Sequence, residues 1–388
     1  MDNQFPPDES STKDVFEVSP ESGPGEGAAN FRAPRQEFLG GSSSPETVQS
    51  SPTEGSKQRD SLDREFVEVN GTRVSYIERG NPHGIPLMYI GGWASSVSGD
   101  KWFLDALEGK IPNSKGLRTL SENNPQSAEG VKRLVESLKD KYRIVDLELP
   151  GFGKSSPLEG EVNLDRMADF VPDFQKAIGL EKPVIFGSSM GGIVAVKLAA
   201  RHPESVKALF LQGVMTQSSD MAKKPYKGGQ FLGSWFVREI VRTPGLFSKV
   251  VTAGSKTDPD FKMSDKEAQA AMAEGFKLAH VKTATATVRE IGKDIGEEIE
   301  KVQCPIVVVD GASGKTVSIL NSANVAVRFH PEIQDPSEKI AQKKVIYLPM
   351  GGKAGEHGHT IVNTFPEGLA TMIDNVLHIL KLDQNPSA

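Results

Sequence analysis

The sequence has almost no cysteine, with Cys304 as the single thiol among 388 residues. One thiol cannot form a disulfide within the chain, so disulfide-stabilised folds are excluded and a hydrophobic core must supply the stability. Cys304 precedes Pro305 at the start of an apolar run, a position typical of a small buried side chain. The absence of disulfides fits a reducing compartment.

Long hydrophobic runs are also missing. No stretch approaches the roughly 18 consecutive apolar residues that a membrane-spanning helix needs. Residues 1–7 are acidic and polar and lack the apolar segment of a secretory signal. We therefore expect a soluble, cytoplasmic protein without a membrane span.

An excess of positive charge is lacking as well, since the net charge is -6 and the pI is near 5.8. Basic residues are scattered, which disfavours nucleic acid as a partner. No cluster of His, Cys or Asp has the spacing of metal ligands, so no metal is expected. Residues 311–316 end in Gly-Lys-Thr, but a phosphate-binding loop needs glycine at the position of Val309. We expect no cofactor.

Residues 1–61 are rich in Ser, Pro, Gly, Glu and Asp and show no hydrophobic periodicity. Such a segment cannot bury enough apolar surface to offset the entropy of ordering, so we predict a disordered tail. A passive tail and one that carries a partner motif remain alternatives.

From residue 64 onward, strand and helix patterns alternate. Alternating strands flank Asn70-Gly71, which predicts a hairpin over 64–77. Further strands are predicted at 86–90, 142–147, 184–186, 208–211, 305–309 and 344–348. Helices are predicted from Trp102, over 128–140, 164–178, 191–201 and 366–381, with an inserted loop at 109–127.

This alternation predicts an α/β fold, a mostly parallel central sheet with helices on both faces. Strand signals vanish between 215 and 300, where helical patterns such as 231–241 and 265–279 dominate. We therefore predict a core of residues 62–214 and 301–388 with a helical cap over 215–300.

The sequence Gly187-Ser188-Ser189-Met190-Gly191 stands between a predicted strand and a predicted helix. This is the G-x-S-x-G nucleophile elbow in the structural context that it requires. A sharp turn there exposes the Ser189 hydroxyl, and glycines on either side leave room for closely approaching backbone. The Met190 N–H would lie at the start of the helix, where unpaired donors and the helix dipole favour an oxyanion.

With this motif the chain resembles the α/β-hydrolase superfamily from about residue 65 to the C-terminus. Gly91-Gly92-Trp93 stands where the family often has His-Gly-Xaa, and the resemblance implies that the Trp93 N–H is the second oxyanion donor. Gly91 departs from the usual histidine. The segment 149–155 resembles the family's Pro-Gly-Xaa-Gly-Xaa-Ser turn, to which we assign a structural role.

The resemblance implies a catalytic histidine on a loop after the last strand. His359 follows Gly358 and precedes Pro366-Glu367 at the family's spacing, and we predict it as the general base in preference to His357.

The family's acid position falls on Gly314, which cannot serve. Asp310 at the strand end is the favoured replacement. Asp220, after the preceding strand, is a second candidate. A Ser-His dyad is a third, with Ser313 or a backbone carbonyl orienting the imidazole.

These residues together predict a serine hydrolase that acts on a small-molecule ester or related acyl substrate. The resemblance also allows an amidase, peptidase, lipase-like enzyme, C–C hydrolase or perhydrolase. Serine at the elbow argues against the epoxide hydrolase and haloalkane dehalogenase branches, which use Asp there. A non-catalytic ligand-binding protein on a hydrolase scaffold is the alternative class, supported by Gly314 in the acid position.

Overall fold

The computed structural model describes residues 63–214, 266–291, 293–311, 345–350 and 361–383, together with the single positions 239, 243 and 246. Within these ranges, side chains are not described at 266–269, 271, 272, 310, 311 and 345–350. The chain divides into two compact units, Met1–Gly55 and Ser56–Ala388, and all described residues belong to the second. The tail predicted over 1–61 lies outside the described residues.

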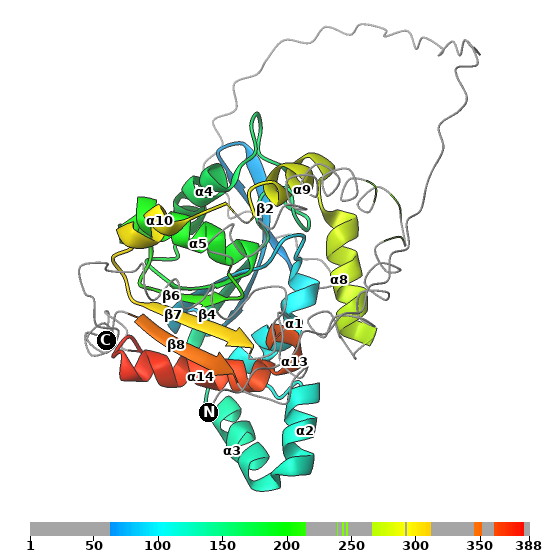
Figure 1. Ribbon diagram of the computed structural model, residues 1–388, viewed down its shortest axis with the longest axis vertical. Coiled ribbons are helices and arrows are strands. Elements are labelled where there is room, and N and C mark those ends of the chain that lie inside the picture. The colour runs from blue at the N-terminus through cyan, green and yellow to red at the C-terminus, as the bar shows by residue number, and fades with distance from the viewer. Residues whose placement is uncertain are drawn as a thin grey trace, which may run out of the picture. The chain divides into compact units, whose positions relative to one another are not determined.

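The centre of the second unit is an eight-stranded sheet with the order β1-β2-β4-β3-β5-β6-β7-β8 (Figure 1). The first two strands pair antiparallel with each other, β2 pairs antiparallel with β4, and all further pairs are parallel. The predicted mostly parallel sheet is thus confirmed. The strands are β1 (Glu65–Val69), β2 (Thr72–Gly80), β3 (Ile85–Ile90), β4 (Tyr142–Leu147), β5 (Val184–Ser188), β6 (Ala208–Gln212), β7 (Ile306–Gly311) and β8 (Val345–Met350).

The predicted hairpin is present, with Val69 opposite Thr72 across the turn. Asn70 and Gly71 both have positive φ, at 50° and 76°. These are the left-handed conformations that a two-residue hairpin turn requires and that Asn-Gly adopts most readily.

Helices cover both faces of the sheet (Figure 1). One face carries α4 (Leu164–Ala177), α5 (Met190–Arg201) and α10 (Gly296–Lys301). The other carries α1 (Val97–Leu107), α13 (Ile361–Thr364) and α14 (Pro366–Ile379), with α3 (Pro125–Glu136) packed on α14. A short 3-10 turn, η1 (Pro203–Ser205), follows α5.

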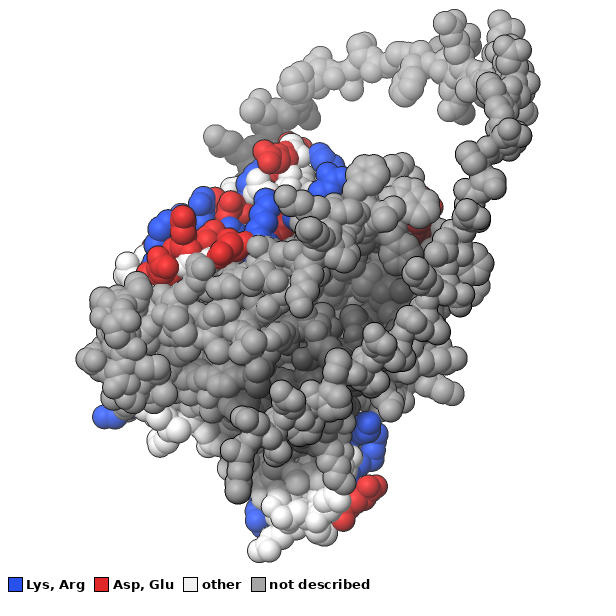
Figure 2. Space-filling model, in the orientation of Figure 1, with Lys and Arg blue, Asp and Glu red and all other residues white. Residues whose placement is uncertain are grey.

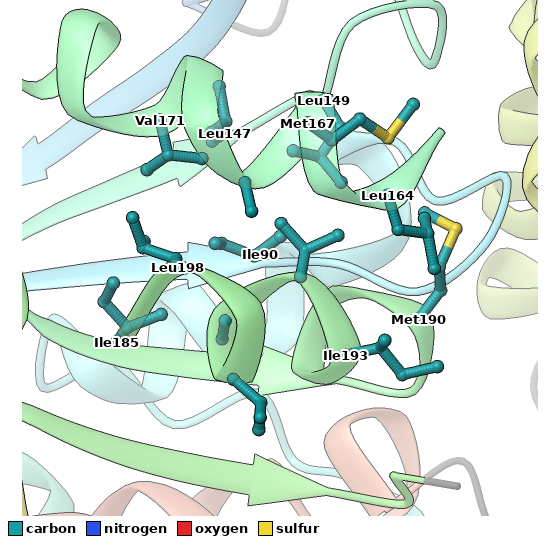
Figure 3. Packing of buried hydrophobic residues seen from close by; sticks show 14 of the residues in the cluster. Ile90, Leu147, Leu149, Leu164, Met167, Val171, Ile185, Met190, Ile193 and Leu198 are labelled. Atoms are coloured by element: carbon teal, nitrogen blue, oxygen red, sulfur yellow. The ribbon is translucent and has the colours of Figure 1, made fainter. Parts of the chain in front are cut away.

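The hydrophobic residues of α4 and α5 form the interior of the first face. Figure 3 shows Met167 and Val171 of α4 and Ile193 and Leu198 of α5 pointing into one apolar layer, which reaches Ile185 on the sheet. Buried residues of the same layer recur at the three- and four-residue spacing of a helix face, which is why the sequence pattern located both helices: Leu164, Met167, Val171 and Phe174 on α4, and Met190, Val194 and Leu198 on α5.

The region 109–127 is not the loop that we predicted. It contains α2 (Lys115–Asn123) and the start of α3, and α1 begins at Val97 rather than at Trp102. Ser114 accepts a hydrogen bond from the Leu117 N–H, so it is the N-cap of α2. Ser114, and likewise Asn124 at the start of α3, are thus helix caps among the polar residues that suggested a loop.

The described part of 215–300 is helical, as predicted. It comprises α8 (Lys266–Leu278), α9 (Val281–Val288) and the first residues of α10. The helix predicted over 231–241 lies outside the described residues except for Glu239, which is helical. The assignment of 215–300 as a cap stays a prediction. None of the described helices is long and apolar enough to cross a membrane.

Acidic and basic side chains alternate over the surface of α4 and its neighbours (Figure 2). Lys197 contacts both Asp165 and Glu298, and Arg201 contacts Asp169. Positive charge on this face is therefore matched by negative charge.

A buried polar contact fastens α2 to α14. The Ser114 N–H and hydroxyl donate to the two carboxyl oxygens of Glu367 at 2.9 and 2.6 Å. Glu367 is fully buried in the first turn of α14, where the helix dipole favours a carboxylate.

We expect Glu367→Ala to lower the free energy of unfolding by about 2–4 kcal/mol, because it leaves the buried Ser114 N–H and hydroxyl without their acceptors. Urea denaturation measures this change. The exposed Glu136→Ala at the end of α3 is the control and should cost less than about 0.5 kcal/mol. Equal costs for the two variants would contradict a fastening role for the Ser114–Glu367 contact.

Candidate active site

Ser189 occupies a strained turn between β5 and α5. Its φ is 52° and its ψ is -118°, a conformation that costs a non-glycine residue about 1–3 kcal/mol. The residue is half-buried, so its side chain is accessible. Met190 is the first residue of α5, and its N–H has no acceptor within the helix.

The glycines around Ser189 are required by close backbone packing. A β-carbon on Gly187 would lie 2.6 Å from the Gly192 α-carbon, and one on Gly191 would overlap the Ile90 carbonyl oxygen. The serine turn, residues 187–191, therefore packs on the start of α5 at Gly187 and on the end of β3 at Gly191, and neither position has room for a side chain.

The turn that follows β3 lies beside Ser189. A β-carbon on Gly92 would be 3.4 Å from the Ser189 β-carbon. The Ser95 N–H closes this turn by donating to the Gly92 carbonyl at 3.0 Å. We call residues 91–93 the oxyanion turn, after their predicted role.

The departure from the family at Gly91 has a steric reason. A β-carbon there would lie 2.6 Å from the Ser95 hydroxyl and 3.2 Å from the Asp100 carboxyl. These two side chains occupy the space that a histidine at position 91 would need.

Trp93 extends from the oxyanion turn toward α8 and α9. Its indole N–H donates to the Ala284 carbonyl at 3.1 Å, and its ring meets Phe276 edge-to-face at 5.2 Å between centroids. The backbone of Ala94 also packs directly on Gly275 of α8. Residues from the predicted cap thus contact the loop that carries the predicted donor.

The segment 149–155 forms a tight loop around Glu148, in line with the structural role that we predicted. The carboxyl group of Glu148 accepts from the Lys154 N–H at 2.7 Å and from the Val97 N–H at 3.1 Å. Gly153 has a φ of 53°, and a β-carbon there would overlap that carboxyl group. Glu148, which follows directly after β4, therefore caps the N-terminus of α1, and no sequence signal near α1 predicts this contact.

The remaining predicted site residues lie wholly or partly outside the described residues. These are His359, His357, Asp220, Ser313 and Gly314. For Asp310 the structure describes the backbone alone, within β7. Their roles stay predictions.

The sequence analysis missed a buried polar group beneath the oxyanion turn. Asp100 accepts from the Tyr89 hydroxyl at 2.9 Å and from the Ser95 hydroxyl at 2.8 Å. Asp146 faces the same space from β4. The available signal was Asp146 itself, since a carboxyl group in a buried parallel strand is unusual.

Burial changes the protonation of this group. It raises the pKa of Asp100 to about 6, opposed by the hydrogen bonds from Ser95 and Tyr89. Burial also raises the pKa of Asp146 well above its ordinary value, and the nearby Asp100 and Glu148 raise it further. No group of His, Cys, Asp or Glu among the described residues has a geometry that could hold a metal ion.

The family model described as alpha/beta hydrolase fold matches residues 124–272. That match, the sheet order and the strand–serine–helix turn agree. This chain has the α/β-hydrolase fold.

Relatives are distant and differ in the share of their length that is matched. The chain is 29% identical over 147 residues to a dihydrolipoyllysine-residue acetyltransferase component of the acetoin cleaving system of Cupriavidus necator. The matched segment covers 38% of this chain and only 31% of that protein. It is 25% identical over 261 residues to the 2-hydroxy-6-oxo-6-(2'-aminophenyl)hexa-2,4-dienoic acid hydrolase of Metapseudomonas resinovorans, covering 66% of this chain and 76% of that one.

Among solved structures, the enol-lactonase of Burkholderia xenovorans LB400 matches with a TM-score of 0.56 at 16% identity, over 81% of this chain and 99% of that one. At this identity the likeness shows the α/β-hydrolase fold alone.

We expect Gly191→Ala to prevent correct folding or to lower the free energy of unfolding by more than about 3 kcal/mol, because the new methyl group overlaps the end of β3. Thermal denaturation measures the change. Gly130→Ala is the matched control, since nothing lies within 4 Å of a β-carbon in this part of α3. The control should be neutral or stabilising by up to about 1 kcal/mol. A tolerated Gly191→Ala would contradict the close packing of the serine turn.

We expect Asp146→Asn to become more stable relative to the wild type as the pH rises. The unfolded chain ionises near the ordinary pKa of 3.8, whereas the folded protein holds the proton to higher pH. Folding then requires proton uptake, so the wild type loses up to about 1.4 kcal/mol per pH unit within that window, and asparagine loses none. Urea denaturation from pH 4.5 to 9 tests this. A difference that does not change with pH would rule out a raised pKa at Asp146.

Proposed function

We propose that this chain is a serine hydrolase that acts on an ester or related acyl compound, with Ser189 as the nucleophile. The observation that carries the proposal is the conformation of Ser189, which is held in a strained strand-to-helix turn beside the oxyanion turn. A fold tolerates such strain where it exposes a reactive group. The relatives named as hydrolase and lactonase are consistent with this class of chemistry.

In the proposed reaction, the Ser189 hydroxyl attacks the substrate carbonyl and passes its proton to His359. The N–H groups of Trp93 and Met190 donate hydrogen bonds to the oxyanion that forms. The tetrahedral intermediate collapses as His359 returns the proton to the leaving alcohol. Water, activated by the same imidazole, then releases the acid and restores the serine.

Asp310 is the residue that we propose to orient the imidazole. The strand register supports this choice, because Ser188 pairs with Gln212 and Gln212 pairs with Val309. Asp310 is therefore one residue beyond the level of Ser188, at the carboxyl end of the parallel strands, where Ser189 also lies. A carboxylate there would fix the tautomer of His359.

We expect the wild type to react with a fluorophosphonate probe and to hydrolyse p-nitrophenyl butyrate, and Ser189→Ala to do neither. Loss of the nucleophile should lower kcat at least about 10³-fold. Ser137→Ala, at the exposed end of α3, is the matched control and should keep full activity. An unreactive wild type would exclude the enzyme and favour a ligand-binding protein on the same scaffold.

The same assay separates the other proposed roles. His359→Ala should lose activity to a similar degree, whereas His357→Ala should retain most of it. Asp310→Asn should lower kcat about 10- to 10⁴-fold if this carboxylate orients the imidazole. An unchanged kcat would instead favour Asp220 or a Ser-His dyad.

A further inference from the structure

Three carboxyl groups are buried together behind the oxyanion turn. Asp100, Asp146 and Glu148 are 4%, 2% and 2% exposed. They line a small cavity that also borders Gly91 and Gly92. Burying so many acidic groups is unfavourable, so their retention beside the proposed site calls for a function.

Asp100 is connected to the oxyanion turn by two consecutive hydrogen bonds. The Ser95 hydroxyl donates to Asp100 at 2.8 Å, and the Ser95 N–H donates to the Gly92 carbonyl at 3.0 Å. The position of Asp100 therefore determines where Ser95 lies, and Ser95 determines the path of the backbone through Gly92.

Asp100 also contacts residues of the sheet that lie next to the serine turn. The Tyr89 hydroxyl donates to Asp100 and lies beside the Ser188 hydroxyl. Ser188 in turn donates to the Gln212 side chain at 2.7 Å, and the Ser189 N–H donates to the Gln212 carbonyl at 2.8 Å. Polar contacts thus extend from Asp100 to both sides of the space in which the oxyanion would form.

We propose that Asp100 is a positioning residue for the oxyanion turn, acting through the Ser95 hydroxyl to hold that turn opposite Ser189. The proposal rests on the proposed serine hydrolase function. Asp100 does not touch the substrate; it fixes the direction of the backbone N–H of Trp93.

The electrostatics explain how Asp100 can act as an acceptor. It lies in the first turn of α1, where the helix dipole favours a negative charge. At the neighbouring Asp146, Arg79 and Arg64 lower the pKa, but the effect of burial, which raises it, is larger. The raised pKa of Asp146 favours its neutral form, which limits the repulsion that Asp100 already receives from Glu148. An ionised Asp100 then accepts two charge-assisted hydrogen bonds, which are stronger than neutral ones.

The Oδ2 atom of Asp146 is buried and has no hydrogen-bond partner among the described residues. The cavity between it and the oxyanion turn leaves about 10 Å³ for water, room for roughly one molecule.

The test compares Asp100→Ala, Ser95→Ala and Asp100→Asn with p-nitrophenyl butyrate as substrate. We expect the two alanine variants to lower kcat about 10- to 100-fold, because the oxyanion donor is misplaced, with KM changed less than about 3-fold. Asp100→Asn should recover kcat to within about 5-fold of the wild type. Its amide oxygen can accept from Tyr89, and its amide N–H can donate to the Ser95 hydroxyl.

Two controls separate positioning from general damage. Asp105→Ala removes another carboxyl group from α1, one that pairs with Arg79, and Ser98→Ala removes a hydroxyl that bonds only to Ser96 among the described residues. Both should retain the kcat of the wild type. A merely structural role would lower stability in the alanine variants and leave kcat per folded molecule unchanged. That result would overturn the proposal.

A readout independent of activity distinguishes this proposal from the proposed function. In a Trp102→Phe/Trp235→Phe background, Trp93 is the only tryptophan and reports on the oxyanion turn. Ser95→Ala should shift its emission and increase its quenching by acrylamide, whereas Ser98→Ala should not. An inactive wild type with this response would refute the hydrolase but retain the positioning contact. An active wild type with unchanged Ser95→Ala kcat and emission would refute the positioning role.

Discussion

The site depends on the contact between the serine turn and the end of β3. The serine turn follows β5, which is the parallel neighbour of β3. The chain therefore leaves both strands at the same end of the sheet, and the two turns lie close together. The absence of a side chain at Gly191 lets the two backbones meet. That approach places Gly92 beside Ser189, at a distance where a β-carbon on Gly92 would contact the Ser189 β-carbon, and it defines the space between them.

This close approach of the backbones restricts which side chains the neighbouring positions can carry. Position 91 cannot carry a side chain because Ser95 and Asp100 fill its space. The buried carboxyl group of Asp100 then needs donors, and Tyr89 and Ser95 supply them. A departure from the family motif at one glycine is thus linked to a polar group that comes from a helix and two strands.

The sequence predicted the features whose cause is local. The Asn70-Gly71 turn, the period of α4 and α5 and the glycines around Ser189 each depend on a few adjacent residues. Helix α2 was missed because its cap, Ser114, reads as a loop residue until Glu367 is placed beside it. Asp100 and Asp146 were missed for a similar reason, since they are 46 positions apart and only the sheet brings them together.

The buried carboxyl groups lower the stability of the fold, and they fix the direction of hydrogen bonds beside the proposed site. The raised pKa of Asp146 favours its neutral form, which lowers the electrostatic repulsion, but the same shift reduces stability as the pH increases. An apolar side chain would be the more stable choice at this position of a buried parallel strand. A hydrophobic contact, however, has no preferred direction, whereas the hydrogen bond from Ser95 to the neighbouring Asp100 fixes the Ser95 hydroxyl in angle as well as in distance. Orientation is what an oxyanion donor requires, and so a polar contact at this place is physically justified despite its cost.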